Sequence, residues 1–194
     1  KDVVESDTTA TIYGKSAHTV AEEYIRDGVP VPPAFEYMKP TLDILSKLEG
    51  EKLCEVRLGL TKDLKACDFN AKNVWWRGIA DLVVINEAKQ LAHSADYKTS
   101  KSARYADVKQ LDLVACGLFA KFPEIKRVRS ALIFTVSKEF VGAEHYAEMM
   151  PKYIEKPSQD VARIEAALKN GVWNPIQGPL CKFCAVKTCE YNRS

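Results

Sequence analysis

The spacing of apolar side chains divides the first part of the chain into helical stretches. Apolar residues recur every three or four positions over residues 15–27 and again over residues 36–48, which predicts two amphipathic helices. Gly28 follows the first stretch directly and indicates where that helix ends.

The next part of the chain has the shorter apolar period of β-strands. The sequence predicts three consecutive strands, over about residues 54–61, 74–85 and 91–100. A strongly amphipathic stretch over residues 106–122 then predicts a further helix, which Pro123 ends.

A second β-rich region follows that helix. Residues 127–138 predict a fourth strand and residues 140–148 a shorter one, before a last helix over residues 158–170. Ser158 is the expected N-cap of this helix, and Asn170-Gly171 is a C-cap signal. The order helix, three strands, helix, strand predicts an α/β fold with a central mixed β-sheet flanked by helices.

One predicted strand contains a carboxylate in apolar surroundings. Asp81 lies in GIADLVVI, which is apolar on both alternating faces and therefore predicts a strand buried on both sides. A hairpin turn centred near Ala88 and Lys89 pairs Asp81 with Asp96 of the next strand, with the Cβ atoms roughly 5 Å apart. Lys98 projects from the same face as Asp96.

Two carboxylates beside one lysine can hold a hard divalent cation, while the ammonium group contacts a phosphate or orients water. The alternative is an ordinary buried ion pair between Lys98 and either aspartate. We favour the metal site, because two carboxylates this close repel unless a cation or a proton separates them. His93 and His145 have no carboxylate or cysteine partner nearby in the sequence and receive no role.

Three short motifs occur in a fixed order along the chain: GIAD ending at Asp81, DYKTSK beginning at Asp96, and QLDLVA beginning at Gln110. With the predicted order of elements, they resemble the PD-(D/E)xK nuclease superfamily. More narrowly, they are similar to its RecB-type branch, which includes CRISPR-associated adaptation nucleases and phage exonucleases. The resemblance spans about residues 14–190 and implies a restriction-endonuclease-like core.

The resemblance also implies a role for each matching residue. Asp81 and Asp96 would bind the metal ion, and the backbone carbonyl of Tyr97 would complete its shell. Lys98 would be the catalytic lysine. His18, in GKSAHTVAEE, matches the histidine that RecB-type members place on an early helix as a further metal ligand.

Other positions match the family less directly. Glu22 lies one helical turn after His18 and within reach of the metal ligands, and Gln110 matches a catalytic-site glutamine that orients the lysine or touches the DNA backbone. Val114 stands where the family usually has Tyr. Glu55 resembles an acidic residue often found in the first strand, but we interpret it as an exposed strand charge.

Three of the six cysteines lie close to the end of the chain. The spacing of Cys181, Cys184 and Cys189 resembles that of cysteines holding a [4Fe–4S] cluster in some RecB-type nucleases. Those members use a fourth, upstream cysteine, for which Cys54 or Cys67 could substitute only if the fold brings it close. Since a cluster or a structural zinc normally needs four thiolates, we favour cysteines packed as small apolar residues and keep the iron–sulfur or zinc site as the alternative.

Composition sets broad limits on the class of protein. With 194 residues, of which 46% are hydrophobic and 28% charged, the sequence predicts one globular domain over residues 1–194, with a cysteine-containing tail, residues 172–194, packed on it. No apolar run approaches the roughly 20 residues of a membrane helix, so we expect no membrane partner and a cytoplasmic location in a bacterium or a phage-infected cell.

The sequence therefore predicts a Mg²⁺- or Mn²⁺-dependent deoxyribonuclease. The net charge of +2 does not itself indicate nucleic-acid binding, but Lys101, Arg104 and Lys109 follow the acidic hairpin and suit phosphate contacts as well as they suit a solvated face. The leading hypothesis is a DNA exonuclease acting on single- or double-stranded ends in end processing, recombination, repair or phage replication. A structure-selective endonuclease and a non-catalytic DNA-binding module remain alternatives.

Overall fold

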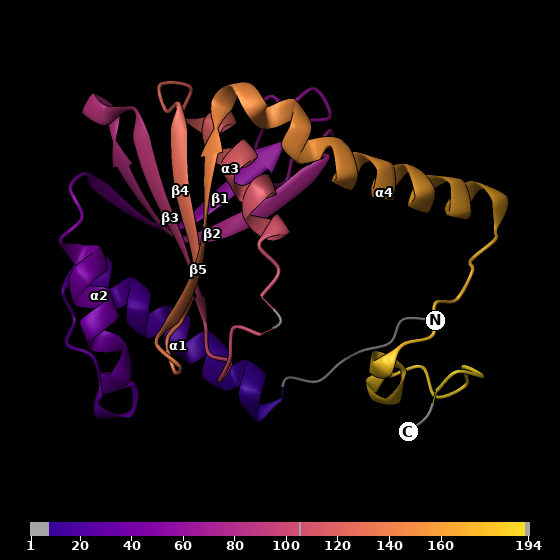
Figure 1. Ribbon diagram of the computed structural model, residues 1–194, viewed down its shortest axis with the longest axis horizontal. Helices are drawn as coiled ribbons and strands as arrows, with labels where there is room; N and C mark the ends of the chain where they lie inside the picture. Colours follow the sequence, from indigo (N-terminus) through magenta and orange to yellow (C-terminus); the bar gives the residue numbers. More distant parts are fainter. Residues whose placement is uncertain (1–7, 105, 193–194) are drawn as a thin grey trace. The chain divides into compact units, whose positions relative to one another are not determined.

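Residues 8–104 and 106–192 are described in the computed structural model of the protein (Figure 1). Their contacts divide them into two compact units. Residues 13–155 form the unit that contains the whole β-sheet, and the other unit joins the residues up to Ile12 with those from Lys156 onwards. The single domain with its tail packed on it therefore stays a prediction.

A mixed five-stranded sheet forms the centre of the larger unit. The strands lie in sequence order, and β3 and β4 are parallel while the other neighbours are antiparallel. This confirms the predicted α/β class with an open mixed sheet. The strands are β1 (Glu51–Leu60), β2 (Trp76–Asn86), β3 (Leu91–Lys98), β4 (Arg127–Phe134) and β5 (Glu139–Tyr146).

The helices end close to the predicted positions, but the first helix begins six residues before its predicted start at residue 15, and the start of the last helix is a larger exception. The α-helices are α1 (Thr9–Asp27), α2 (Lys39–Ser46), α3 (Lys109–Lys121) and α4 (Met150–Asn170), and short 3-10 helices cover Pro33–Met38, Glu87–Lys89, Ala147–Met149 and Pro179–Phe183. Gly28 and Gly171 adopt the positive φ angles, 70° and 68°, that suit a residue directly after a helix. None of the helices among the described residues has the length and apolar character to cross a membrane.

The larger exception is the start of the last helix, which the sequence placed at Ser158. This prediction is wrong, because α4 begins eight residues earlier at Met150 and contains Pro157 in its interior. Met150 packs against the main apolar core, so the helix starts where tertiary contacts support it. Pro157 removes one backbone hydrogen bond without ending the helix.

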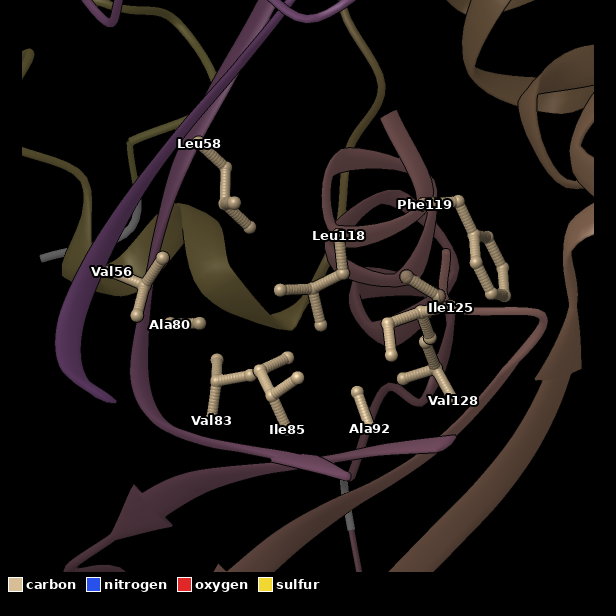
Figure 2. Packing of buried hydrophobic residues seen from close by; sticks show 11 residues of the cluster. Val56, Leu58, Ala80, Val83, Ile85, Ala92, Leu118, Phe119, Ile125 and Val128 are labelled. Carbon is tan, nitrogen blue, oxygen red and sulfur yellow. The ribbon is translucent and has the colours of Figure 1, made fainter. Parts of the chain in front are cut away.

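Helices cover both faces of the sheet. Leu118 and Phe119 of α3 pack on one face against a cluster that includes Val83 and Ile85 of β2 (Figure 2). On the other face, buried residues of α1 and α2 pack against β2 and β3, namely Ala17, Ala21 and Leu42 against Leu82, Val84, Ala95 and Tyr97. The sheet is thus the middle of three layers, and β2 and β3 are its best-covered strands.

Close packing between β2 and α3 depends on a glycine. A Cβ atom on Gly117 of α3 would lie 3.0 Å from the ring of Trp76 and 3.1 Å from the side chain of Leu58. The indole ring therefore fills the space that a larger residue at this helical position would need.

We predict that Gly117→Val lowers the free energy of unfolding by about 1–3 kcal/mol, because the added methyl groups must displace Trp76 or Leu58. Urea denaturation measures this loss. Gly14→Ala is the matched control: Gly14 is also helical, but an added Cβ makes only an ordinary 3.7 Å contact with Thr99. The control should be stabilised by about 0.5–1 kcal/mol, and equal effects of both substitutions would contradict the packing argument.

Candidate metal centre

His18 connects α1 to strands β2 and β3. Its Nδ1 lies 3.3 Å from Oδ2 of Asp81, and its Nε2 lies 2.9 Å from the backbone carbonyl oxygen of Tyr97. The neighbouring Ala17 and Ala21 are fully buried against β2 and β3, and this packing holds the helix close enough for the imidazole to reach the strands. The predicted proximity of His18, Asp81 and Tyr97 is therefore observed.

The hairpin between β2 and β3 positions Asp81. The predicted register is confirmed as far as the pair Leu82–Ala95, and Asp81 and Asp96 are the next residues on the two strands. Beyond that pair, a side chain takes the place of the backbone hydrogen bonds between β2 and β3: Oδ2 of Asp81 accepts the N–H of Tyr97 at 2.7 Å. The carboxylate, only 8% exposed, is thereby fixed between the strands.

A change in strand alternation brings Glu55 to the same place. Glu55 of β1 lies opposite Asp81, between the pairs Cys54–Leu82 and Val56–Ala80. Cys54 and Leu82 pack with α1 and α2, whereas Val56 and Ala80 pack with α3. In a regular strand, residues two positions apart point to the same face, so the two pairs would pack on one side of the sheet. They pack on opposite sides, so the alternation of faces shifts by one residue in both strands at Glu55 and Asp81. Glu55 has a φ angle of 52°, in the left-handed region that non-glycine residues rarely adopt.

Three ligand-bearing side chains converge as a result. One ligand atom each from His18, Glu55 and Asp81 lies within 4.8 Å of the other two. The interpretation of Glu55 as an exposed strand charge is therefore wrong, because the residue is half-buried and belongs to this group. Burial, and then the nearby Asp81 carboxylate, raise the pKa of Glu55. The apolar pattern of the sequence does not report the shift in alternation, and the resemblance of Glu55 to an acidic residue of the family was the one signal that pointed to this position.

Asp96 and Lys98 lie beside this group and form an ion pair. Burial first, and then the charge of Asp81, raise the pKa of Asp96, while Lys98 and His18 oppose the rise. Oδ2 of Asp96 is buried and contacts Nζ of Lys98 in this ion pair. The predicted ligand Asp96 therefore pairs with lysine, next to the group of His18, Glu55 and Asp81.

These residues fit a hard divalent cation. The donors are carboxylate oxygens, a backbone carbonyl and one imidazole, which suit Mg²⁺ or Mn²⁺. The 2.9 Å between Nε2 of His18 and the oxygen of Tyr97 is close to the ~3 Å that separates neighbouring ligands of an octahedral ion. Burial and the nearby Asp81 carboxylate raise the pKa values of Glu55 and Asp96, so a cation beside these carboxylates would be stabilising.

His18 can itself supply positive charge when its ring is protonated. The contact with Asp81 raises the pKa of His18 above its ordinary value of 6.5, although burial opposes this effect, and the Tyr97 carbonyl adds to it. When protonated, the ring can donate from both nitrogens, to Asp81 and to Tyr97. A proton and a metal ion therefore compete for the same ring.

Two further predicted residues lie outside the group. Glu22 forms an ion pair with Arg26 on α1, and its charge contributes to the raised pKa of Glu55. Gln110 is exposed in the first turn of α3, where its Nε2 donates to the backbone oxygen of Asp107 at 2.8 Å. Glu22 thus acts electrostatically on the site, and Gln110 bonds within its own loop rather than to the lysine.

Basic residues follow the site along the chain. Lys101, Arg104 and Lys109 are exposed, between the end of β3 and the first turn of α3. They begin three residues after Lys98, so this segment presents positive charge from the strand end that carries the acidic group. Val114, at the position where the family usually has Tyr, packs against the apolar core.

His145, which the sequence left without a role, has a carboxylate partner far away in the chain. Its Nε2 lies 2.9 Å from Oδ1 of Asp112 on α3, and its ring packs edge-on against Tyr153. His145 is only 1% exposed, so this pair connects β5 to α3 in the interior rather than at a surface site.

The tail cysteines are half-buried and do not converge on one ion. Sγ of Cys181 accepts the N–H of Gly178 at 3.4 Å, and the N–H of Cys184 bonds to the carbonyl of Cys181. Within the described ranges, 8–104 and 106–192, the metal-ligating group found is that of His18, Glu55 and Asp81. An iron–sulfur cluster or zinc at Cys181, Cys184 and Cys189 stays an untested alternative.

No protein-family model matches the chain, and comparison with curated proteins finds no match. Among solved structures, the chain is similar to one described as "Crystal structure of SSO0001", with 14% sequence identity and a TM-score of 0.40. The alignment covers 94% of this chain and 81% of that one. A similarity this low carries no argument, so the function is argued from the geometry of the site.

We predict that Mn²⁺ stabilises the protein, and more strongly as the pH rises. Protonated His18 contributes stability below its ordinary pKa of 6.5, and this contribution is lost as the pH rises through its raised pKa, where the ring becomes free to bind a metal ion. At a hundred times Kd, Mn²⁺ should add about 2.7 kcal/mol, which raises Tm by roughly 5–10 °C.

Thermal unfolding with and without Mn²⁺, at about pH 8 and about pH 5.5, tests this expectation. Asp81→Asn should remove the Mn²⁺ effect, whereas Asp63→Asn, in an exposed loop, should keep it. A Tm that Mn²⁺ leaves unchanged in the unsubstituted protein at the higher pH would contradict the metal centre.

A separate prediction concerns Glu55. Glu55→Gln should lower the affinity for Mn²⁺ by about tenfold or more, because it removes one of the converging ligands. It should leave the metal-free protein as stable or more stable, since it removes a carboxylate that is crowded against Asp81. Calorimetric titration and urea unfolding measure the two effects. Glu51→Gln, at an exposed position of the same strand, is the control and should change neither quantity.

Proposed function

We propose that this protein is a Mg²⁺- or Mn²⁺-dependent deoxyribonuclease, with a PD-(D/E)xK site of the RecB type on a restriction-endonuclease-like core. The observation that carries the proposal is the convergence of His18, Glu55 and Asp81 directly beside the ion pair of Asp96 and Lys98. Such a site combines ligands for a hard cation with an ammonium group that can meet a phosphate.

The chemistry of phosphodiester hydrolysis suits these groups. A bound Mg²⁺ or Mn²⁺ ion polarises a phosphate oxygen and lowers the pKa of its water. Lys98 keeps 34% of its side chain exposed, so its ammonium can contact a phosphate that arrives from solvent and stabilise the charge that develops on it. Tyr97 fixes Asp81 through its N–H and presents its carbonyl to His18, so one residue of β3 orients two of the ligands.

The same charges argue against a DNA-binding module without metal. The Asp81 carboxylate contributes to the raised pKa of both Glu55 and Asp96, and uncompensated carboxylates repel a phosphate backbone. Lys101, Arg104 and Lys109 are exposed beside the site and can attract DNA. Binding and metal-dependent cleavage are therefore coupled in this proposal. Attack on DNA ends remains the first expectation, with roles in end processing, recombination, repair or phage replication.

We predict that the protein cleaves end-labelled DNA with Mg²⁺ or Mn²⁺ and that EDTA stops the reaction. Lys98→Met should lower the rate by about 10²–10³-fold, because it removes the ammonium group next to the cation site. Asp96→Asn should also abolish most cleavage. A ladder growing from one end of linear single- or double-stranded DNA would identify an exonuclease, and loss of closed circles an endonuclease.

The matched controls are Lys72→Met and Asp63→Asn, at exposed positions outside the site, and both should keep full activity. DNA binding without metal-dependent cleavage of any substrate form would sink the proposal. Full activity of Lys98→Met would contradict the role given to the lysine even if the protein is a nuclease.

A further inference from the structure

A trough crosses the sheet next to the metal centre, on the face that carries α1 and α2. It encloses about 500 Å³, which is within the range of small-molecule binding sites. Strands β3, β4 and β5, which lie side by side in Figure 1, form most of its floor, and two leucines of α2 form one wall. Its lining includes Leu45, Leu48, His93, Arg129, Phe140 and Glu144.

The floor of the trough is a row of small residues. Ala95, Ala131 and Gly142 are direct cross-strand partners on β3, β4 and β5, and all three line the trough. Since none of them has a side chain beyond Cβ, the sheet is hollowed along this row. The row extends towards β2 at Leu82, which pairs with Ala95.

Two different rows border the small one. On one side, His93, Arg129 and Glu144 are cross-strand partners, and Arg129 donates from Nε to Oε1 of Glu144 at 2.9 Å. On the other side, Phe140 pairs with Ile133. The two bordering rows are four residues apart along the strands, or about 13 Å. The trough therefore has one polar border and one aromatic border.

Phe140 is exposed to an unusual degree for its size. Its side chain is 75% accessible, although burying a phenylalanine typically stabilises a protein by about 1.5–3 kcal/mol. An exposed aromatic ring beside a hollow is the arrangement on which a flat ligand ring can stack. The guanidinium group of Arg129 offers a second planar surface on the opposite border.

His93 adds a neutral polar group to the polar border. Burial, followed by the charges of Arg129 and Arg127, lowers the pKa of His93, so its imidazole is neutral at physiological pH and has one donor and one acceptor nitrogen. Glu144 supplies further acceptors. Donors and acceptors of both kinds can therefore meet the polar edge of a heterocyclic ring that enters the trough.

The trough begins next to the strand positions that carry two of the acidic residues. Leu82 and Ala95 line it, and they directly adjoin Asp81 and Asp96 in the chain. From β3 to the edge strand β5 the distance is two strand spacings, or about 10 Å. That distance corresponds to about three stacked nucleotides of one DNA strand.

We infer that the trough holds an unpaired base of the DNA strand whose backbone reaches the metal centre, stacked on Phe140 and with its polar edge towards His93 and Arg129. This inference rests on the proposed nuclease function and adds a substrate class, since it requires single-stranded DNA or a frayed end. A base inside a duplex is stacked on both sides and paired along its edge, so it presents neither surface to such a hollow.

Single-stranded oligodeoxynucleotides with one abasic site, moved stepwise from the end, test the inference. Binding is measured by fluorescence anisotropy with Ca²⁺ in place of Mg²⁺. One position should weaken binding to the unsubstituted protein by about fivefold or more, the effect of losing one stacked base. In Phe140→Ala the same position should have no effect, because the stacking partner is already missing.

Ala131→Leu, which fills the floor of the trough, should weaken binding of the intact strand to a similar extent. Phe183→Ala is the matched control, because Phe183 is a 74% exposed ring in the other unit, and it should keep the position-dependent effect. 2-Aminopurine at the sensitive position should lose fluorescence on binding to the unsubstituted protein and not on binding to Phe140→Ala.

The outcomes separate this inference from the nuclease proposal. Suppose that the protein cleaves DNA with metal ions but that an abasic site weakens binding equally at every position. This result would overturn the trough inference and would not affect the nuclease proposal. Binding of a blunt duplex as tightly as a single strand would also overturn the inference. If the abasic scan is position-dependent but Mg²⁺ and Mn²⁺ support no cleavage, base binding stands and the nuclease proposal fails.

Discussion

The repulsion among three carboxylates at the junction of β1, β2 and β3 is the constraint on which the rest of the site depends. Glu55 and Asp81 lie opposite each other, Asp96 follows on the next strand, and burial prevents water from screening them fully. Protonated His18 and the ammonium of Lys98 offset part of this repulsion in the metal-free protein. A divalent cation would offset it more completely, and it would release both groups for other contacts.

The packing of helices on both faces of the sheet accounts for the local backbone. If β1 and β2 kept regular alternation through Glu55 and Asp81, Leu82 and Ala80 would point to the same face of the sheet. One of them would then lose its contact with the helices that cover its present face. The shift in alternation instead lets Leu82 pack under α1 and Ala80 under α3, at the expense of a left-handed conformation at Glu55. Such unusual backbone geometry persists only where surrounding packing enforces it, and it is concentrated at functional sites.

Periodicity in the sequence is sufficient to predict the strands and their register. Contacts between residues that lie far apart in the chain cannot be predicted from it. The turn near Ala88 is sufficient to predict the β2–β3 register, because register follows from turn position. The placement of Glu55 required the backbone break, and the partner of His145 lies 33 residues away on α3. The start of α4 was misplaced because Ser158 is locally a good N-cap residue, while packing of Met150 on the core favours the earlier start.

The topology determines where a substrate can reach the metal centre. Parallel strands need a crossover connection, and α3 supplies it between β3 and β4 on one face of the sheet. On the opposite face, the buried residues of α1 and α2 pack on β2 and β3, whereas the trough extends across β4 to Phe140 and Glu144 of β5. The ligands thus lie at the border between covered and accessible sheet. Packing under α1 and α2 holds the acidic groups there, while the adjacent strands leave an accessible surface that the proposed DNA substrate would contact.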